Sequence, residues 1–398
     1  MSTTPVILSG VRTAIGSFAG SLSGVSPRDM GTAVAEEAIR RAGVLPGEIG
    51  QTIFGNVIHT APEDMYISRV VAMGAGVPDT APALTLNRLC GSGLQAVVSA
   101  AEQIQLGKAD VALAGGVESM SRSGHLLTSS RAGQKMGDAL AVDMMIGALT
   151  DPFGHGHMGI TAENVAQEHG IDRATQDALA LESHRRAARA IADGRFREQI
   201  LPLNLRRGRA DVVFDTDEHV RAEVSGEDLA RLRPAFRKEG SVTAGNASGL
   251  NDGAAALVLM DEALARKQGR TPMARILATG LSGVAPDLMG LGPIPASRQA
   301  LDRAGLTVSD LDVIESNEAF AAQACAVASV LGLPPEKVNP NGGAIALGHP
   351  IGASGAIILV KLLYELKRVG GRYGLATMCI GGGQGIAMVV EAMGDTPG

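Results

Sequence analysis

The sequence predicts an α/β protein made of two duplicated halves, with a helical insertion between them. Short apolar runs alternate with helical segments in the first third of the chain, and the same alternation returns from Met273. Between the two regions, from about residue 121 to 249, Arg, Gly and Ser are frequent and strand signals are weak. Glycine occurs 52 times in 398 residues, about twice its average usage, which indicates many tight turns between strands and helices.

The first third contains a regular series of expected elements. We expect a strand at 6–8 that ends in a turn at Gly10, further strands at 52–56, 83–86 and 111–114, and a helix at 93–106. A helix should also run from Ser26 to about Arg41, because Pro27 follows a capping serine and Gly43 supplies a stop. Strands that alternate with helices form βαβ units, so we expect a mainly parallel sheet.

The remaining elements complete the second half. A long helix is expected at 174–193 in the insertion, followed by strands at 275–278, 313–315 and 374–378 and a helix from about Ala319. The glycine-rich segments 84–93 and 343–352 occupy equivalent places before a long helix in the two halves. This order of elements is typical of a duplicated unit.

Composition excludes several classes of protein. A formal charge of −6, no Trp and few other aromatic residues argue against a nucleic-acid partner. The chain has no convincing membrane span or signal peptide, so we expect a cytoplasmic protein with no membrane partner. The three cysteines are widely spaced and form no CxxC, which leaves no disulfide framework and no metal site. The segment 154–159 fits GxGxxG by letter, but no buried strand precedes it.

Two residues stand out as a nucleophile and its base. Cys90 precedes an expected helix and is followed by Gly91 and Gly93; the helix dipole should lower the pKa of its thiol. The alternative is a buried structural cysteine. His349 lies among glycines with no charged neighbour and could activate a thiol. The alternative here is a buried histidine whose ring is satisfied by the backbone.

Two further residues lie where strands meet turns. Cys379 ends an apolar strand before a turn of four glycines in residues 381–385, whose backbone N–H groups could point at an oxyanion. Asn317 follows the strand at 313–315 and could hold a water or an oxyanion; the alternative is a helix N-cap. Cys325 lies outside every motif and is expected in the core of the following helix.

Taken together, these motifs resemble those of the thiolase family over essentially the whole chain. The matching segments are 87–93 around the cysteine, Asn-Glu-Ala-Phe at 317–320, 342–355 with Gly-His-Pro, and 379–385. The resemblance implies a thiolase fold: two duplicated α/β halves in a five-layered αβαβα arrangement with an inserted loop domain. It implies an N-terminal half of 1–120 plus 249–272, a loop domain at 121–248 and a C-terminal half at 273–398.

The resemblance also implies roles for the residues. Cys90 would carry the acyl group as a thioester, with His349 as its base. Cys379 would take a proton from the α-carbon of acetyl-CoA or donate one to departing CoA. Asn317, through a water, and His349 would stabilise the enolate-like oxygen, and the N–H groups of Cys90 and Gly381 would form a second oxyanion hole.

Other positions match residues that contact CoA or its acyl group. They are Leu149, His157, Met158, Arg221, Phe236, Ala244, Ser248, Met289, Ala319 and Phe320. Arg221 would meet the adenosine phosphates, in a region where Lys and Arg outnumber Asp and Glu. Segment 121–143 matches the family's tetramerisation segment, so a homotetramer is expected, although Gly124 stands where many relatives have proline.

The function that follows is a reversible Claisen condensation of acetyl-CoA with a short-chain acyl-CoA. Acetyl-CoA, acyl-CoA and CoA are the implied partners, as substrates, and no cofactor is implied. The resemblance is strongest to acetyl-CoA acetyltransferases and to the β-ketothiolases of polyhydroxyalkanoate biosynthesis. The alternatives are a degradative 3-ketoacyl-CoA thiolase of fatty acid metabolism, a non-catalytic acyl-CoA-binding protein of the same fold, and a ketoacyl-ACP synthase, which Cys379 disfavours.

Overall fold

The computed structural model describes residues 3–208 and 210–393. In the N-terminal half, the strand order is β1 (Pro5–Thr13), β13 (Asn251–Asp261), β5 (Val111–Ser119), β3 (Gln51–Gly55) and β4 (Ala83–Leu86). In the C-terminal half it is β14 (Ala274–Gly283), β17 (Gln384–Ala392), β16 (Tyr373–Ile380) and β15 (Val313–Ser316). The halves join where Val6 and Ile7 of β1 pair with Arg275 and Ala274 of β14.

The sheet is mixed, and the expectation of a mainly parallel sheet was wrong. β1, β13 and β5 pair antiparallel, as do β14, β17 and β16, whereas β3, β4 and β15 make parallel pairs. The reason is connectivity: β16 returns as β17 through the short glycine turn at 381–383, which permits only antiparallel pairing. The short edge strand β2 (Gly16–Ser17) pairs with β13, and β10 (Ile200–Leu201) pairs with β1.

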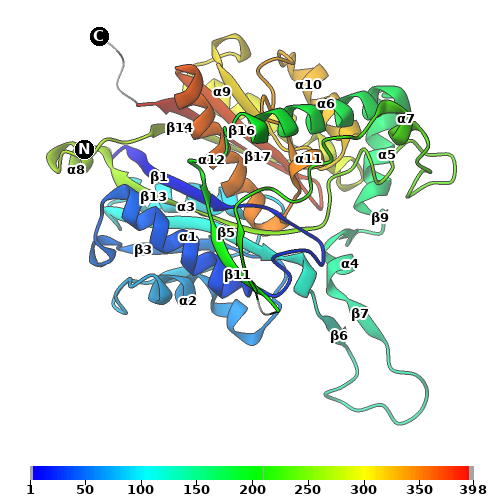
Figure 1. The fold of residues 1–398 in the computed structure, drawn as a ribbon, viewed down its shortest axis with the longest axis horizontal. Coiled ribbons are helices and arrows are strands. Elements are labelled where there is room, and N and C mark those ends of the chain that lie inside the picture. Colours follow the sequence, from blue (N-terminus) through cyan, green and yellow to red (C-terminus); the bar gives the residue numbers. More distant parts are fainter. Residues whose placement is uncertain (1–2, 209, 394–398) are drawn as a thin grey trace.

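Helices complete five layers (Figure 1). Helices α1 (Pro27–Ala42) and α2 (Ile67–Gly74) cover the outer face of the N-terminal half. Helices α3 (Ser92–Gln105) and α12 (Ile351–Val369) pack against each other between the halves, and α9 (Pro293–Ala304) covers β14 and β17 on the other side. α8 (Glu262–Lys267) follows β13, and α10 (Ala321–Leu331) and the short α11 (Ala344–Leu347) lie near the insertion.

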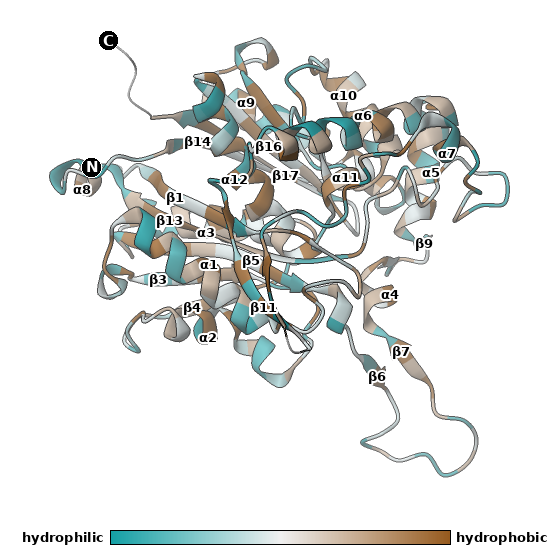
Figure 2. Ribbon diagram, viewed as in Figure 1, coloured by the Kyte–Doolittle hydropathy of each residue, from teal (hydrophilic) through white to brown (hydrophobic). Residues whose placement is uncertain are grey.

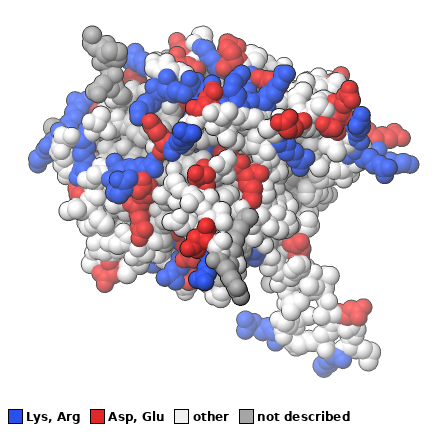
Figure 3. Space-filling model, in the orientation of Figure 1, with Lys and Arg blue, Asp and Glu red and all other residues white. Residues whose placement is uncertain are grey.

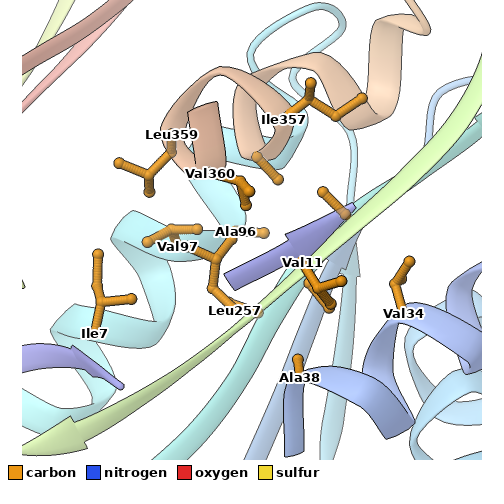
Figure 4. Close-up of a cluster of buried hydrophobic side chains, with 14 of the residues drawn as sticks. Ile7, Val11, Val34, Ala38, Ala96, Val97, Leu257, Ile357, Leu359 and Val360 are labelled. Carbon is orange, nitrogen blue, oxygen red and sulfur yellow. The ribbon is translucent and has the colours of Figure 1, made fainter. Parts of the chain in front are cut away.

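The central helix α12 explains why the layers hold together. Its residues are apolar on nearly every side, as Figure 2 shows, and most of them are buried. Val360 and Ile357 of α12 lie near Val97 of α3 and Leu257 of β13 in one core cluster (Figure 4). A helix that is hydrophobic all round belongs in a core.

Gly10 does not end the first strand, as the sequence suggested, but lies in the middle of β1. A Cβ atom at this position would lie 3.1 Å from Cγ2 of Val360. The glycine therefore allows close approach of α12 to the sheet instead of forming a turn. The long helices were predicted well: α1 ends at its left-handed Gly43 cap, and α6 (Arg173–Ala192) matches the expected helix to within about a residue at each end.

The insertion contributes helices and small hairpins at one side of the layers. In chain order these are β6 (His125–Leu127), β7 (Ala141–Asp143), α4 (Met144–Ala148), β8 (Thr150–Asp151), β9 (Gly156–His157), α5 (Met158–Glu168), α6, β11 (Leu203–Arg207), β12 (Ala210–Phe214) and α7 (Gly226–Ala230). The β6–β7 hairpin extends away from the body of the molecule (Figure 1). A fully buried ion pair between Arg12 of β1 and Asp217, 2.7 Å long, fixes the insertion to the sheet.

Candidate active site

Two helix N-termini meet at the centre of the molecule because glycines allow their backbones to touch. A Cβ atom on Gly93 of α3 would lie 2.7 Å from the backbone nitrogen of Ala356 of α12. One on Gly355 of α12 would lie 2.3 Å from the nitrogen of Leu94. Any side chain at either position would force the helices apart. The residues just before these helices, Cys90 and His349, are therefore brought to the same region.

A strained turn presents Cys90. Leu89 has a φ of 45°, a left-handed conformation that is unusual for a non-glycine residue. Ser92 stabilises the turn: its hydroxyl donates to the carbonyl of Leu89 at 2.7 Å and accepts from the amide of Arg88 at 2.8 Å. Strain of this kind is concentrated at functional sites. Cys90 as a whole residue is partly exposed, but its sulfur is buried among the surrounding layers.

The backbone amides of Gly381 and of Cys90 itself face the sulfur of Cys90 and act to lower the pKa of its thiol. These two amides are the pair expected from the sequence to form an oxyanion hole. Burial nevertheless raises the pKa of Cys90 to about 11, with a smaller contribution from nearby Glu118. The expected lowering of this pKa was wrong, because desolvation of the sulfur outweighs the amide of Cys90, just before α3, and the amide of Gly381, just after β16.

Cys379 lies beside Cys90. It is buried near the end of β16, and burial together with the neighbouring Cys90 raises the pKa of its thiol well above the usual range. A Cβ atom on Gly91 would lie 2.5 Å from Cδ1 of Ile380, so the Cys90 turn packs directly on the end of β16. The structure thus brings together the two cysteines that the sequence singled out. Cys325, the third, lies on α10 and is only half-buried.

His349 is buried with one ring nitrogen free. Its Nδ1 lies 2.6 Å from the hydroxyl of Ser354, and its amide donates to Oδ1 of Asn251 at 2.9 Å. Nε2 is buried and has no hydrogen-bond partner. The alternative of a histidine satisfied by the backbone is therefore wrong. Burial lowers the pKa of His349 to about 4, so the imidazole is neutral near pH 7 and can accept a proton.

Asn317 also has an unused polar atom. Its Nδ2 is buried without a partner, while its backbone amide donates to the carbonyl of Thr377 on β16 at 2.9 Å. It is not a helix N-cap, because α10 begins four residues later, after Phe320. A space of about 10 Å³, at the lower limit of what one water needs, is lined by Asn317, Gly348 and Ser354 among others. The side chain can therefore hold a water or an oxyanion.

Five of the ten residues expected to contact CoA or its acyl group form one apolar cluster beside Cys379. Its buried members include Met158, Met289, Ala319 and Phe320, with Phe236 packed against them. The ring of Phe236 stacks on His157 at 4.8 Å and meets Phe320 edge-on at 6.3 Å. Met289 lies on the short 3-10 segment Pro286–Leu291. A Cβ atom on Gly381 would lie 3.1 Å from Cε of Met158, so this methionine borders the amide that faces Cys90.

The other expected CoA contacts surround this cluster or lie farther out. Leu149 accepts a hydrogen bond from the amide of Met158, and Ser248 donates its amide to the carbonyl of Ala319. Ala244 and Arg221 are exposed. The amide of Arg221 donates to Nδ1 of His184 at 3.2 Å, and its carbonyl accepts from the amide of Val224.

Three buried residues that support the site were not among those predicted from the sequence. Glu118 accepts from the amides of Val57, Ile58 and Gly352, and so fixes the start of α12. Asn251 holds the amide of His349, and Ser354 holds its ring. Ser354 lies five residues after His349 in the matched segment 342–355, and this spacing could have identified it. Glu118 and Asn251 have no local signal, because their partners are distant in the chain.

The described residues contain no cluster of His, Cys, Asp or Glu that could hold a metal ion. Nor is any described helix long and apolar enough to span a membrane.

Comparisons with known proteins agree over nearly the whole length. Family models for the thiolase N-terminal domain and the thiolase C-terminal domain match residues 5–263 and 270–392. The chain is 60% identical to beta-ketothiolase BktB of Cupriavidus necator, over 98% of this chain and all of the relative.

Solved structures show the same similarity. A Bacillus anthracis acetyl-CoA acetyltransferase superposes with a TM-score of 0.96 and 47% identity, covering 98% of this chain and 99% of the other. Human mitochondrial 3-ketoacyl-CoA thiolase in complex with CoA gives a TM-score of 0.95 and 40% identity, covering 98% of each chain. The five-layered fold expected from the sequence is confirmed.

Proposed function

The chain belongs to the thiolase family of acyltransferases, and from that premise we propose that it condenses acetyl-CoA with a short-chain acyl-CoA. The products are a 3-ketoacyl-CoA and free CoA, and the reaction is reversible. One observation supports the proposal above the others. The backbone amides of Cys90 and Gly381 face the sulfur of Cys90, which lies beside the thiol of Cys379 and next to an apolar cluster.

The first half-reaction acylates Cys90. Nε2 of His349 takes the proton of the Cys90 thiol, and the sulfur attacks the carbonyl carbon of the acyl-CoA. The two amides at Cys90 and Gly381 stabilise the oxyanion that forms. When the carbon–sulfur bond to CoA breaks, Cys379 donates its proton to the departing thiolate. The enzyme then carries an acyl thioester on Cys90, a thiolate on Cys379 and a protonated His349.

The second half-reaction forms the carbon–carbon bond. The Cys379 thiolate removes a proton from the α-carbon of acetyl-CoA. His349 and a water held by Asn317 stabilise the enolate oxygen, consistent with the small cavity and the unpaired amide of Asn317. The enolate carbon attacks the acyl group, the bond to Cys90 breaks, and His349 returns its proton to the Cys90 sulfur. Both thiols end as they began.

The outer residues hold CoA in this proposal. The apolar cluster of Met158, Met289, Phe236, Ala319 and Phe320 surrounds the acyl group and the adjoining part of the pantetheine arm. Leu149, His157, Ala244 and Ser248 border the arm, and exposed Arg221 pairs with a phosphate of the adenosine end. We assign most of this binding to a loop domain at 121–248, inserted between an N-terminal half of 1–120 plus 249–272 and a C-terminal half of 273–398. Met289, Ala319 and Phe320 are contributed by the C-terminal half. Residues 1–2, 209 and 394–398 of these three parts lie outside the described residues.

The assembly proposed is a cytoplasmic homotetramer built through the β6–β7 hairpin. Its segment exposes Leu126, Leu127, Met136 and Leu140, which are half or more accessible. The hairpin carries few charges on the face seen in Figure 3. An exposed apolar projection of this kind is typical of an interaction surface.

Thiolysis assays test the proposed activity. The enzyme should cleave acetoacetyl-CoA efficiently and 3-ketohexanoyl-CoA less well, and mass spectrometry should find the acyl group on Cys90. Equal kcat/KM values for short and long 3-ketoacyl-CoA substrates would favour a degradative thiolase. Binding of acyl-CoA without acylation of Cys90 would indicate the non-catalytic alternative.

A further inference from the structure

A second cavity, of about 350 Å³, lies behind the segment that carries Asn317. Ser316 and Glu318 line this cavity, whereas Asn317 between them lines the small space near Ser354. Neighbouring side chains of an extended segment point to opposite sides, which explains the division. The cavity is therefore separate from the site of Cys90 and Cys379, but any occupant would contact the residues on both sides of Asn317.

The wall of the cavity is largely apolar. Its apolar members come from α6, from α10 and from the loop that follows α10: Leu179, Ala324, Ala328, Leu333, Pro335 and Val338. The thiol of Cys325 on α10 also lines it. Pockets that bind small molecules have this composition, with a few polar groups that fix orientation.

One polar group in the cavity has no partner. The side chain of Ser316 is only 3% exposed, and its hydroxyl makes no hydrogen bond within the protein. Buried hydroxyls are normally paired, so an unpaired one at a cavity wall indicates a place for an external partner. A hydroxyl can both donate and accept, so the partner group could be a carbonyl or another hydroxyl.

Each charged side chain at the wall already has hydrogen-bond partners within the protein. The Glu318 carboxylate accepts from Ser183 at 2.6 Å, from Asn339 at 2.9 Å and from the amide of Ile345. Arg186 pairs with Glu182 at 2.8 Å and donates to the carbonyl of Val338 at 2.6 Å. A carboxylate in the cavity would be repelled by Glu182 and Glu318. A cation would be repelled by Arg186 and would lose its hydration at an apolar wall, because the carboxylates of Glu182 and Glu318 are already engaged by Arg186, Ser183 and Asn339. The charge pattern selects an uncharged molecule.

We propose that this cavity is a second binding site, distinct from the CoA site, for a small uncharged molecule with an apolar body and one hydroxyl or carbonyl group. The apolar body packs between α6 and α10, and the polar group pairs with Ser316. Cys325 serves as part of the wall. Burial raises the pKa of its thiol to about 11, which is unsuited to a nucleophile.

Cyclohexanol is a suitable probe, and cyclohexanecarboxylate is its matched anionic control. Occupancy is measured at Cys325 with methyl methanethiosulfonate. The Cys325 sulfur attacks the sulfenyl sulfur of the reagent, a mixed disulfide forms and methanesulfinate leaves. Peptide mass spectrometry separates this modification from those of Cys90 and Cys379. At ten times its Kd, cyclohexanol should slow modification of Cys325 about tenfold, whereas the carboxylate should not.

Two variants on the same helix make the test specific. Ala328→Leu fills the cavity and should remove protection by cyclohexanol. Ser329→Leu places the same side chain at an exposed position of α10 that does not line the cavity, and should keep protection. Crystals soaked in cyclohexanol should show its hydroxyl beside Ser316, a readout that does not depend on the reactivity of Cys325.

Equal protection by the two compounds, or protection that persists in Ala328→Leu, would overturn the proposal. So would soaked crystals that show only solvent in the cavity. These outcomes are independent of whether the enzyme condenses acetyl-CoA, because none of the measurements uses turnover.

Discussion

Nδ1 of His349 and the hydroxyl oxygen of Ser354 lie 2.6 Å apart. The same hydroxyl lies 2.9 Å from the carbonyl of Pro350, to which it can only donate. Its hydrogen is therefore used there, and the oxygen accepts from Nδ1–H. This arrangement leaves the lone pair of His349 on Nε2, the nitrogen with no partner in the protein. Ser354, at the start of α12, thus favours the tautomer of His349 with its proton on Nδ1. This tautomer leaves Nε2 able to accept a proton, as the proposed base for Cys90 must.

Ser354→Ala tests this relationship. Without the hydroxyl, Nδ1 loses its acceptor and the tautomer is no longer fixed, so acylation of Cys90 should slow by about 10- to 100-fold. KM for the acyl-CoA should change little, because Ser354 is not among the proposed substrate contacts. Stopped-flow acylation, with mass spectrometry of the acyl-enzyme, gives the rate. Ser329→Ala, at an exposed position, is the control, and a wild-type acylation rate in Ser354→Ala would contradict the proposed role.

The pH dependence of alkylation tests the state of Cys90. Burial raises the pKa of its thiol to about 11, and burial lowers that of His349 to about 4, so the two groups are both neutral near pH 7. Iodoacetamide reacts with the thiolate, whose population grows as the pH rises toward the thiol pKa. The rate of carbamidomethylation at Cys90 should therefore keep increasing from pH 7 to above pH 9.

Acetyl-CoA should protect Cys90 in the same experiment, because the acetylated sulfur cannot react. A rate that is already constant below pH 7 would instead indicate a thiolate–imidazolium pair. Modification confined to Cys325 would contradict the assignment of the nucleophile.

Cys379→Ala should separate the two half-reactions. Loss of the second proton carrier should lower turnover by about 10²- to 10⁴-fold. Acyl-Cys90 should still form, although slowly, because His349 and both amides at Cys90 remain. Intact-protein mass spectrometry detects the accumulated acyl-enzyme. Cys325→Ala is the matched control and should retain wild-type turnover; thiolysis near the wild-type rate in Cys379→Ala would argue against a mechanism with two cysteines.

Features that depend on neighbouring residues in the chain could be predicted from the sequence. Helix α1 was predicted from its proline and its Gly43 cap. Cys90, His349, Asn317 and Cys379 were chosen as candidates because each lies in a glycine-rich or polar segment, and the resemblance to thiolases supplied their expected roles. Whether neighbouring strands run parallel or antiparallel could not be predicted from neighbouring residues. It depends on which strands pair, and the antiparallel partners β1 and β13 are separated by most of the N-terminal half and the insertion.

Properties that depend on how distant segments pack together also could not be predicted from short stretches of sequence. The start of α3 suggested a lowered thiol pKa for Cys90, but the pKa follows from how completely the surrounding layers bury the sulfur. Glu118 reaches the start of α12 across the sheet and has no nearby motif. Gly10 resembled a turn residue in the sequence, because the close approach of Val360 to its backbone depends on the packing of α12.

Oligomeric state provides a further prediction. A homotetramer should have a mass near 163 kDa by light scattering, four times the 40.7 kDa of one chain. Replacing Leu126 and Leu127 by Asp puts charges on the exposed hairpin, and should reduce the assembly to dimers without affecting the distant core. Replacing Leu106, which is exposed at the end of α3, by Asp should leave the tetramer intact. A stable wild-type monomer would contradict the proposed assembly.

The acyl chain length should be set by Met158 and Met289. Both are nearly fully buried in the apolar cluster that contains Cys379. Each added substrate methylene gains at most ~0.8 kcal/mol on burial, whereas displacing a packed methionine costs roughly 1–3 kcal/mol. Methionine is flexible and can repack, so one or two extra carbons should be tolerated. We therefore expect good use of C4 and C5 3-ketoacyl-CoA, weaker use of C6 and little of C10.

Met289→Ala should relax this limit. Removing the side chain opens space beside Cys379, so the ratio of kcat/KM for C6 over C4 should rise by about tenfold, equivalent to ~1.4 kcal/mol. The same cavity should destabilise the protein by about 2–5 kcal/mol, which urea unfolding can measure and which confirms that Met289 is packed in solution. Met136→Ala, at a position that is 92% exposed, should change neither quantity. If the wild-type enzyme cleaved C10 as efficiently as C4, Met289 would not limit the pocket, and a degradative preference for long chains would follow.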